Sequence, residues 1–309
     1  MAMGDAERYN VVIIGAGIGG LSTAIWARRL GLSALVLDDG PEAGGQLRSI
    51  VQPIVDYPGL HGETGTTLAE RLRTQAEAAG ALLRPAARVL RIDAAARRCE
   101  TATGAVTGDA VVLATGLAER RLGVPGEADL VPRGLRRRPT KEPCWFRGKR
   151  VAVVGGGDRA AENALLLTAL AQRVHLLHRG DRLRARQSFQ EAIAAGPLVD
   201  LRLETEVVAI HCHGDVIRLD LVCRSLPETL AVDALCIYIG NRPNTELVEG
   251  QVALLPEGYV IIDRDGQSSL PGIYAVGDVC TPPRYQSLAT AAGQAMVAAK
   301  HIALTLSGQ

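Results

Sequence analysis

The sequence predicts an α/β protein of two three-layer domains, each built around a parallel central sheet, with the second domain inserted into the first. Two observations predict this fold. A run of β-branched residues leads into a glycine-rich turn near the start of the chain, and the same arrangement returns at residues 150–160. In each place a strand, a turn, a helix and a second strand follow in order, which is the order of a Rossmann unit.

The first unit opens with a predicted strand over residues 11–14, which runs into a Gly-x-Gly-x-x-Gly pattern. Gly15 permits the tight turn, Gly17 lets the backbone approach a pyrophosphate, and Gly20 lets the helix pack closely on the strand. The helix predicted over residues 21–30 then points its first N–H groups and its dipole at the phosphates. This unit therefore predicts a dinucleotide site.

A second strand over residues 33–37 ends at Asp38, whose carboxylate can accept hydrogen bonds from a ribose. After Asp38 we expect a glycine-rich loop at 39–47 and an amphipathic helix over 66–79. Short strands are predicted at 82–83, 87–92 and 109–113.

The second unit has a predicted strand over 150–154, a Gly-x-Gly-x-x-Ala turn and a helix over 161–170. Its next strand, over 173–179, ends in His178 and Arg179 instead of an acid. An acid at this place favours a ribose 2′-hydroxyl, whereas an arginine can bind a 2′-phosphate. The first site therefore suits FAD, and the second suits NADPH better than NADH.

The segment 122–143, rich in proline, glycine and arginine, is predicted to connect the domains. Further strands are expected up to about residue 239, at 258–263 and at 272–276, before a closing helix over 288–306. The predicted domains are an FAD-binding domain of residues 1–117 and 245–309 and an NAD(P)H-binding domain of residues 118–244.

Composition excludes several classes of protein. The net charge is +1, so no overall field recruits nucleic acid or an acidic membrane. No apolar stretch reaches the length of about 18 residues that a membrane span needs, and no signal peptide is evident, so we expect a cytoplasmic protein. The six cysteines are scattered without a Cys-x-x-Cys, and in a reducing compartment we expect them to act as small buried hydrophobes.

Motifs outside the two turns make the chain recognisable. They are Gly-Gly-Gln-Leu at 44–47, Asp-Tyr-Pro-Gly at 56–59, Ala-Thr-Gly at 114–116, Gly-Val-Pro-Gly-Glu at 123–127, His-Arg at 178–179 and Pro-Gly-Ile-Tyr-Ala-Val-Gly-Asp at 271–278. Over nearly its whole length the chain resembles the low-molecular-weight thioredoxin reductase family of two-dinucleotide flavoproteins. The resemblance implies an oxidoreductase that uses FAD and NADPH and forms a homodimer.

The glycine patterns and the resemblance together name the residues expected at each cofactor. For FAD these are Gly15, Gly17, Gly20, Asp38, Gly45, Gln46, Val89, Thr115, Gly116, Gly277, Asp278, Gln286 and Ser287. For NADPH, with NADH as the alternative coenzyme, the expected residues are Gly155, Gly157, Arg159, His178, Arg179 and Arg184. The resemblance gives Asp278 the role of holding the ribityl chain of the flavin.

The chain departs from the family at the redox disulfide. Counted back from the strand at 150–154, the family's Cys-x-x-Cys falls on Arg138-Pro139-Thr140-Lys141. One thiol of that pair attacks the substrate disulfide and the other resolves it or meets the flavin, which arginine and lysine cannot do. We therefore expect no thioredoxin reduction by the family mechanism. Catalytic residues stay unassigned, with Glu142 and Cys144 as candidates by position; packing is the simpler role for Cys144.

Three further departures concern the cofactor sites. Gly180 stands where the family has a second arginine, Arg159 replaces a small residue under the pyrophosphate, and Tyr285 replaces the arginine of an Arg-Gln pair. The Leu-Ala-Thr that follows at 288–290 resembles ferredoxin–NADP reductases of thioredoxin-reductase type. Those enzymes carry an aromatic C-terminal extension over the flavin, which we do not expect here.

Two further clusters of polar residues have a simpler explanation than a binding site. His211-Cys212-His213 could ligate a metal, but neighbours on a strand point to opposite faces, so no metal site is predicted. A basic run could dock an acidic partner such as ferredoxin or a carboxylated substrate, but a solvated loop is the favoured explanation; the run is Arg133, Arg136, Arg137, Arg138 and Lys141.

Three functions remain open. The first is an FAD-dependent NAD(P)H oxidoreductase that passes electrons to a non-disulfide acceptor, either a small molecule such as a quinone or oxygen, or a protein such as ferredoxin. The second is a flavin-dependent oxidase or dehydrogenase of a metabolite, in which Gly180 and Arg159 mark a decaying nicotinamide site. The third is a sensor that binds FAD without turnover, which the retained motifs disfavour.

Overall fold

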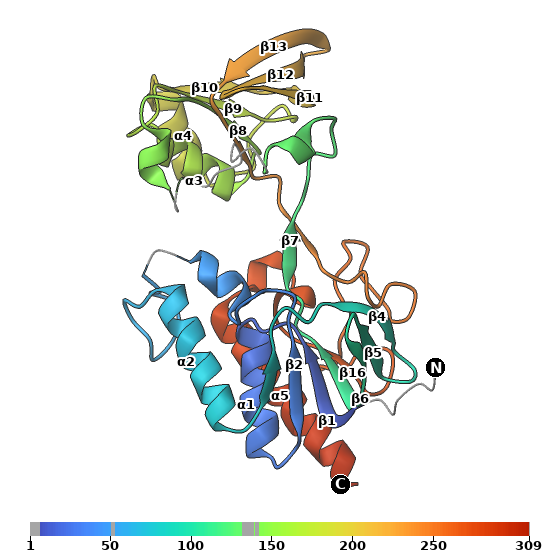
Figure 1. Ribbon diagram of the computed structural model, residues 1–309. Coiled ribbons are helices and arrows are strands. Elements are labelled where there is room, and N and C mark those ends of the chain that lie inside the picture. Colours follow the sequence, from blue (N-terminus) through green and yellow to red (C-terminus); the bar gives the residue numbers. More distant parts are fainter. Residues whose placement is uncertain (1–6, 51–52, 132–138, 140–141, 309) are drawn as a thin grey trace. The chain divides into compact units, whose positions relative to one another are not determined.

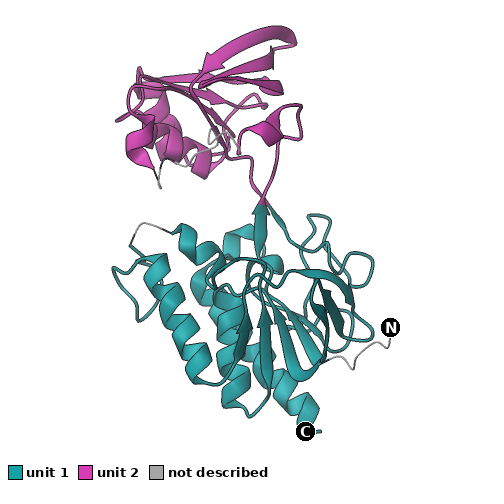
Figure 2. Ribbon diagram, in the orientation of Figure 1, with its two compact units in different colours: residues 1–118, 242–309 teal, residues 119–241 magenta. Residues whose placement is uncertain are grey.

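The computed structural model describes residues 7–50, 53–131, 139 and 142–308. It divides into two compact units, one formed by Met1–Ala118 with Arg242–Gln309 and the other by Glu119–Asn241 (Figure 2). The chain thus builds part of unit 1, forms unit 2 and returns. The predicted α/β fold with one domain inserted into the other is confirmed.

Unit 1 is built on a seven-stranded sheet whose strand order is β3-β2-β1-β6-β5-β4, with β16 paired to β6 (Figure 1). The strands are β1 Glu7–Ile14, β2 Ala34–Leu37, β3 Leu82–Arg84, β4 Val89–Asp93, β5 Arg98–Thr101, β6 Gly104–Leu113 and β16 Ile273–Ala275. The pairs β3·β2, β2·β1, β1·β6 and β6·β16 are parallel, while β4, β5 and β6 form an antiparallel extension.

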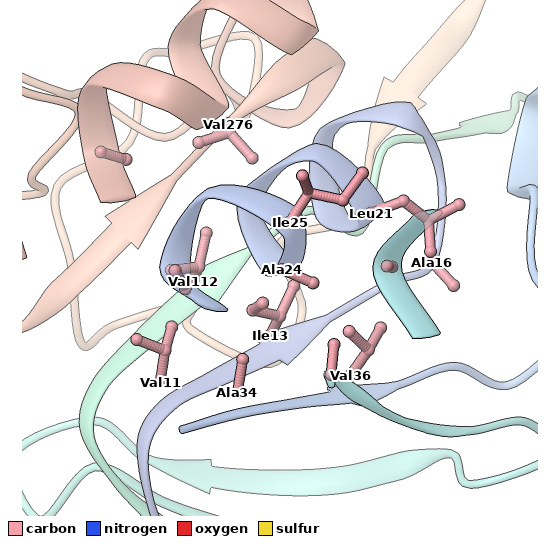
Figure 3. Packing of buried hydrophobic residues seen from close by; sticks show 14 of the residues in the cluster. Val11, Ile13, Ala16, Leu21, Ala24, Ile25, Ala34, Val36, Val112 and Val276 are labelled. Atoms are coloured by element: carbon pink, nitrogen blue, oxygen red, sulfur yellow. The ribbon is translucent and has the colours of Figure 1, made fainter. Parts of the chain in front are cut away.

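Alternation along β1 divides the core of unit 1 into two faces. Val11 and Ile13 point to the helices, where they pack with Ala24 and Ile25 of α1 (Figure 3). Val12 and Ile14 belong to the cluster on the other face. Successive side chains of a strand point to opposite faces, and a parallel strand covered on both faces is apolar throughout, which explains the unbroken Val-Val-Ile-Ile run.

The α-helices in the described part of unit 1 are α1 Ile18–Arg29, α2 Gly65–Ala78 and α5 Leu288–Ser307. Helix α1 contacts both α2 and α5. Side chains from the loops after residue 244 join the cluster on the opposite face of the sheet, at Val248, Val252 and Val260. The sheet of unit 1 therefore lies between a helical layer and a largely non-helical one.

Unit 2 repeats the plan on a smaller sheet, in the parallel order β10-β9-β8-β14. Its strands are β8 Arg150–Val154, β9 Arg173–Leu177, β10 Val199–Arg202 and β14 Ala234–Ile237, and its helices are α3 Asp158–Leu167 and α4 Gln187–Ala195. A separate antiparallel sheet packs against the other face, formed by β11 Thr205–His213, β12 Val216–Cys223 and β13 Leu226–Val232.

The two passages of the chain between the units are short strands that pair with each other, β7 Leu117–Glu119 and β15 Asn241–Pro243. The described residues also form the 3-10 helices η1 Gly45–Ser49, η2 Glu127–Asp129, η3 Pro143–Phe146, η4 Gly277–Val279 and η5 Pro283–Tyr285. In the part of the chain that the structure describes, no helix is both long and apolar enough to cross a membrane.

The elements differ from the prediction mainly at their ends. Helix α1 begins at Ile18 instead of residue 21, because the glycine turn already has helical geometry despite the low helix propensity of glycine. Helix α3 likewise begins at Asp158 instead of 161. Helix α4 was not predicted, since only Ile193 of its nine residues is buried and the apolar period is weak. The segment predicted as a strand at 258–263 makes only isolated bridges.

Candidate functional site

In the first glycine turn, backbone atoms pack so closely that a side chain at two of the glycines would collide with them. Gly15 has a φ of +104°, and a Cβ there would lie 2.3 Å from the carbonyl oxygen of Ala114. A Cβ at Gly20 would lie 1.8 Å from the carbonyl oxygen of Gly15. Because real Cβ atoms do not approach backbone this closely, both positions require glycine, and α1 can sit against the ends of β1 and β6.

Gly17, between them, has the opposite surroundings. It caps the N-terminus of α1 with an extended backbone, and nothing lies within 4 Å of the place where its Cβ would be. The first turn of α1 has no acidic residue. The turn therefore presents an open face with unpaired helical N–H groups, which is the environment that a phosphate requires.

The glycine pair after β2 closes on this turn. The N–H of Gly44 donates to the carbonyl of Ala16 at 2.8 Å. A Cβ at Gly45 would lie 3.2 Å from the Cα of Gly17. Gly45 and Gln46 open the 3-10 helix η1, and the amide nitrogen of Gln46 reaches the space beside Gly116. Four predicted FAD residues from three separate segments, Gly17, Gly45 with Gln46, and Gly116, thus meet at one place.

Asp38 follows β2 and faces the same turn. Its Oδ2 accepts a hydrogen bond from the N–H of Ala16 at 2.5 Å, and its Oδ1 accepts one from Gly40 at 2.8 Å. Burial raises the pKa of this carboxyl, and the two backbone donors partly offset that shift. Each oxygen keeps a lone pair that can accept from a ribose hydroxyl. Val89 lies two residues after Ala87, whose N–H donates to the carbonyl of Asp38 at 2.7 Å.

Thr115 and Gly116 follow β6 and are held by Asn244. The hydroxyl of Thr115 donates to the carbonyl of Asn244 at 2.7 Å, and the side-chain amide of Asn244 donates to the carbonyl of Thr115 at 2.8 Å. The N–H of Asn244 also donates to the carbonyl of Gly116 at 3.0 Å. This reciprocal pairing fixes the turn after β6 with its glycine at a φ of +63°. Sequence reasoning did not identify Asn244 as a functional residue.

Gly277 and Asp278 follow β16 and open η4. The carboxylate of Asp278 is half-buried, and no residue in the described part of the chain hydrogen bonds to it. Burial raises its pKa. Gln286 and Ser287 come next along the chain: the Gln286 amide donates to the carbonyl of Thr281 at 2.9 Å, and the Ser287 hydroxyl caps α5 by accepting from the N–H of Thr290 at 3.0 Å.

These segments share one edge of one sheet. Gly15, Asp38, Thr115 and Gly277 each come directly or almost directly after a strand, and those strands are the parallel neighbours β1, β2, β6 and β16. Ligands of doubly wound sheets bind at this carboxyl edge. An open glycine at a helix N-terminus and a half-buried carboxylate without a partner are what a flavin dinucleotide needs, so the residues present fit FAD.

The second glycine turn has the same construction. Gly155 has a φ of +149°, and a Cβ there would lie 2.2 Å from the carbonyl oxygen of Tyr238. Gly157 caps α3 and has nothing within 4 Å of its missing Cβ. Asp158, in the first turn of α3, is paired with Arg186 at 3.0 Å and therefore leaves the helix N-terminus without an unpaired negative charge.

His178 lies against this second turn. A Cβ at Gly156 would be 2.3 Å from its ring Nδ1, and a Cβ at Gly180 would be 2.9 Å from its Nε2. The ring thus fills space that side chains at 156 and 180 would need. Burial lowers the pKa of His178, and the nearby Arg184 and Arg179 lower it further, which favours a neutral ring at pH 7. Sequence reasoning treated Gly180 only as a lost arginine.

Arginines surround the second turn. Arg184 is exposed, and its N–H donates to the carbonyl of Gly156 at 2.7 Å, which ties its backbone to the turn. Arg179 is exposed at the end of β9. Arg159 follows Gly157 in α3, and its guanidinium lies 5.9 Å from the ring centroid of Tyr238. Within the described residues none of these three arginines forms an ion pair, so their charges are available to a phosphorylated ligand.

The catalytic candidates remain without a defined role. Cys144 is exposed in η3, and Glu142 precedes that helix. Arg138, Thr140 and Lys141 lie outside the described residues, as do Arg133, Arg136 and Arg137. None of the six cysteines, all within the described ranges, forms a disulfide.

His211, Cys212 and His213 do not form a metal centre. The His211 ring pairs with Asp220 at 2.7 Å. Among the described residues there is no group of three histidine, cysteine or acidic side chains that could hold a metal ion.

Comparison with known proteins gives concordant matches. Residues 9–295 match the model of a family described as pyridine nucleotide-disulphide oxidoreductase. The chain is 37% identical over 303 residues to NADPH-dependent thioredoxin reductase 3 of Arabidopsis thaliana, a match that covers 94% of this chain and 57% of that protein. It is 36% identical to a glucosaminate ammonia-lyase of Pseudomonas fluorescens, covering 96% of this chain and 95% of that protein. The thioredoxin reductase of Lactococcus lactis, in a crystal structure of its FR conformation, superimposes with a TM-score of 0.82 at 27% identity over 97% of this chain and 100% of that chain.

The two glycines of the first turn make a matched pair for mutation. Gly20→Ala is expected to lower the free energy of unfolding by about 3 kcal/mol, because the new Cβ meets a carbonyl oxygen. Gly17→Ala has room, and by restricting the unfolded chain it should leave the protein unchanged or stabilise it by about 0.5 kcal/mol. It should nevertheless weaken dinucleotide binding, because its methyl group faces the phosphates. Urea denaturation of the cofactor-free proteins measures the difference, and equal losses for both variants would contradict this account.

Asp278→Asn is expected to stabilise the cofactor-free protein at neutral pH. Burial raises the pKa of Asp278 in the folded state, so the folded carboxyl holds its proton at pH values where the unfolded one has lost it. Its contribution to stability therefore falls as pH rises from below the unfolded pKa of 3.8 through the raised folded pKa. The gain from Asp278→Asn should thus be present at pH 7 and vanish below pH ~3. Denaturation curves at several pH values check this, and a loss of stability at pH 7 would refute it.

Proposed function

The chain belongs to the pyridine nucleotide-disulphide oxidoreductase family, and on that premise we propose that it is an FAD-dependent NADPH oxidoreductase that passes electrons to an acceptor other than a disulfide. It is a flavin oxidoreductase of thioredoxin-reductase type. Beyond this class of enzyme, we propose where each cofactor binds and which kind of acceptor takes the electrons. We further propose a cytoplasmic homodimer, by analogy with its relatives.

One observation carries the assignment of cofactors. In both glycine turns the middle glycine, Gly17 or Gly157, lies at a helix N-terminus with free space beside it. The charged side chains next to the two turns have opposite signs. Asp38 closes the first, which suits a ribose with a 2′-hydroxyl. Arg179 and Arg184 close the second without ion-pair partners among the described residues, which suits a 2′-phosphate. FAD at the first turn and NADPH at the second follow from this contrast.

The residues of unit 1 have separate tasks in holding FAD. The N–H groups at the start of α1 receive the pyrophosphate, and Asp38 receives a ribose. Asp278, which lacks a hydrogen-bond partner in the described part of the chain, accepts from hydroxyl groups of the ribityl chain. Bound FAD supplies hydride and electron transfer, for which the twenty side chains have no equivalent.

The nature of the acceptor is inferred from the sequence. By resemblance, the family's redox disulfide falls on Arg138-Pro139-Thr140-Lys141, and the chain has no Cys-x-x-Cys anywhere. Relay of electrons to a protein disulfide needs two thiols. The acceptor proposed here is therefore a quinone or other small molecule, oxygen, or an iron–sulfur protein such as ferredoxin.

A second candidate function rests on Gly180. The family's second arginine is absent there, and the ring of His178 occupies the adjacent space. In this alternative the nicotinamide site has decayed, and the protein oxidises a small metabolite and passes the electrons to oxygen. The similarity to a glucosaminate ammonia-lyase is compatible with it. Release of hydrogen peroxide on addition of a metabolite without NADPH would favour this alternative.

Anaerobic mixing tests the proposed function directly. Addition of NADPH to the purified flavoprotein should bleach the visible flavin absorbance with about one equivalent of coenzyme. Addition of thioredoxin or of a small aromatic disulfide should leave the flavin reduced, whereas a quinone or oxygen should restore the absorbance. Absence of bleaching would reject the assignment of an NADPH-dependent oxidoreductase, and rapid reoxidation by thioredoxin would reject the assignment of the acceptor.

Removal of the site arginines should change the preference between coenzymes. Loss of a charge-assisted hydrogen bond to the 2′-phosphate in Arg179→Ala or Arg184→Ala should raise the Kd of NADPH by about 10- to 100-fold, with little effect on NADH. Arg173→Ala is the matched control, because this exposed arginine lies at the opposite end of β9 and bonds to the carbonyl of Pro197. Stopped-flow titration of flavin reduction measures both coenzymes. Equal effects of all three substitutions would refute a 2′-phosphate site.

A further inference from the structure

The turn that carries Asp278 is held from both sides of Gly277. Gly277 follows β16 with a φ of +76° and is buried. Its N–H donates to the side-chain oxygen of Gln294 at 2.7 Å, and its carbonyl accepts from the hydroxyl of Thr281 at 2.8 Å. Gln294 lies on α5, so the turn is attached to the long C-terminal helix.

Gln294 and Thr281 also bond to each other and close a ring of hydrogen bonds. The amide nitrogen of Gln294 donates to the hydroxyl oxygen of Thr281 at 3.1 Å, and that hydroxyl donates to the carbonyl of Gly277 at 2.8 Å, a shorter contact than its 3.3 Å to the amide oxygen of Gln294. The backbone N–H of Gly277 can only donate, so the oxygen of the Gln294 amide must face it. The N–H of Gly277, the hydroxyl of Thr281 and one N–H of the Gln294 amide each have an acceptor, and Thr281 is only 4% exposed, so these bonds hold the turn in a mostly buried place.

Asp278 has no such support of its own. Its carboxylate has no hydrogen-bond partner among the described residues, so its side chain is placed by the backbone that carries it. That backbone is set by Gly277, and Gly277 is set by the ring. Gln294 accepts from the N–H of Gly277 and orients the Thr281 hydroxyl that donates to the carbonyl of Gly277. That carbonyl also accepts from the N–H of Cys280 at 3.2 Å, a bond within the turn itself.

We propose that Gln294 is a positioning residue that fixes the Gly277-Asp278 turn and so determines how tightly the flavin is held. The inference rests on the proposed function, because it requires FAD at this turn. Gln294 acts through Gly277 and Thr281, and its role is to keep the carboxylate of Asp278 in place before the cofactor arrives. Such preorganisation lowers the cost of binding and slows release.

The rate of FAD release from the purified holoprotein tests this role. Gln294→Met keeps the length of the side chain but removes both hydrogen bonds, and should speed release by about tenfold. Thr281→Val breaks the ring at its other member and should act in the same direction. Because both residues hold the same turn, the double variant should release FAD no more than about twofold faster than the faster single variant. The visible flavin spectrum should shift in all three variants.

Gln251→Met is the matched control. Gln251 also lies in unit 1 and also clamps backbone with both ends of its amide, accepting from the N–H of Ala94 at 2.8 Å and donating to the carbonyl of Ile92 at 3.0 Å. It should lower the thermal stability as much as Gln294→Met does, without changing FAD release or the flavin spectrum.

The outcomes separate this inference from the proposed function. A wild-type protein that neither contains nor binds FAD rejects the proposed function. If wild type binds FAD and is reduced by NADPH, but Gln294→Met and Thr281→Val release FAD no faster than Gln251→Met, the positioning role is rejected and the proposed function stands. Should Gln294→Met not fold, Thr281→Val against the same control decides the question.

Discussion

The architecture of both sites depends on one steric constraint, a close approach of two backbone segments at each glycine turn that leaves no room for a Cβ. A Cβ at Gly20 would lie 1.8 Å from one carbonyl oxygen, and a Cβ at Gly155 would lie 2.2 Å from another. This closeness brings the N-terminus of each helix to the carboxyl edge of its sheet. In unit 1 the same edge collects residues after four parallel strands, so a single packing contact organises segments far apart in sequence.

The two glycine turns have similar backbone packing, but the charges of the side chains beside them differ. The first meets Asp38, which is bound to the turn itself, whereas the second meets Arg179 and Arg184, which form no ion pair within the described part of the chain. A polar group placed in a site without its partner costs stability until a ligand supplies that partner. Asp278, half-buried and without a hydrogen-bond partner in the described part of the chain, is such a group, and its placement is easier to explain by a ligand than by folding.

Much of this could be read from the sequence, because glycine spacing and apolar runs are local signals. The strand over residues 11–14, the two turns and the order of the domains belong to this class. Other features depend on contacts between distant residues. Asn244 holds Thr115 from 129 positions away, and the ring of His178 packs on Gly156 and Gly180, neither of which has a local pattern. Helix α4 was missed because it buries little, and the strand predicted at 258–263 failed because its apolar residues pack on the sheet without joining it.

The paired strands β7 and β15 have an evolutionary consequence. Since the chain leaves unit 1 and re-enters it on neighbouring strands, the two ends of the inserted segment, Glu119 and Asn241, lie close together. A contiguous piece of gene encoding unit 2 can then be replaced by another without disturbing the sheet of unit 1. The insertion point therefore separates unit 2 from the sheet of unit 1, so that a change confined to unit 2 need not alter the strand order of unit 1.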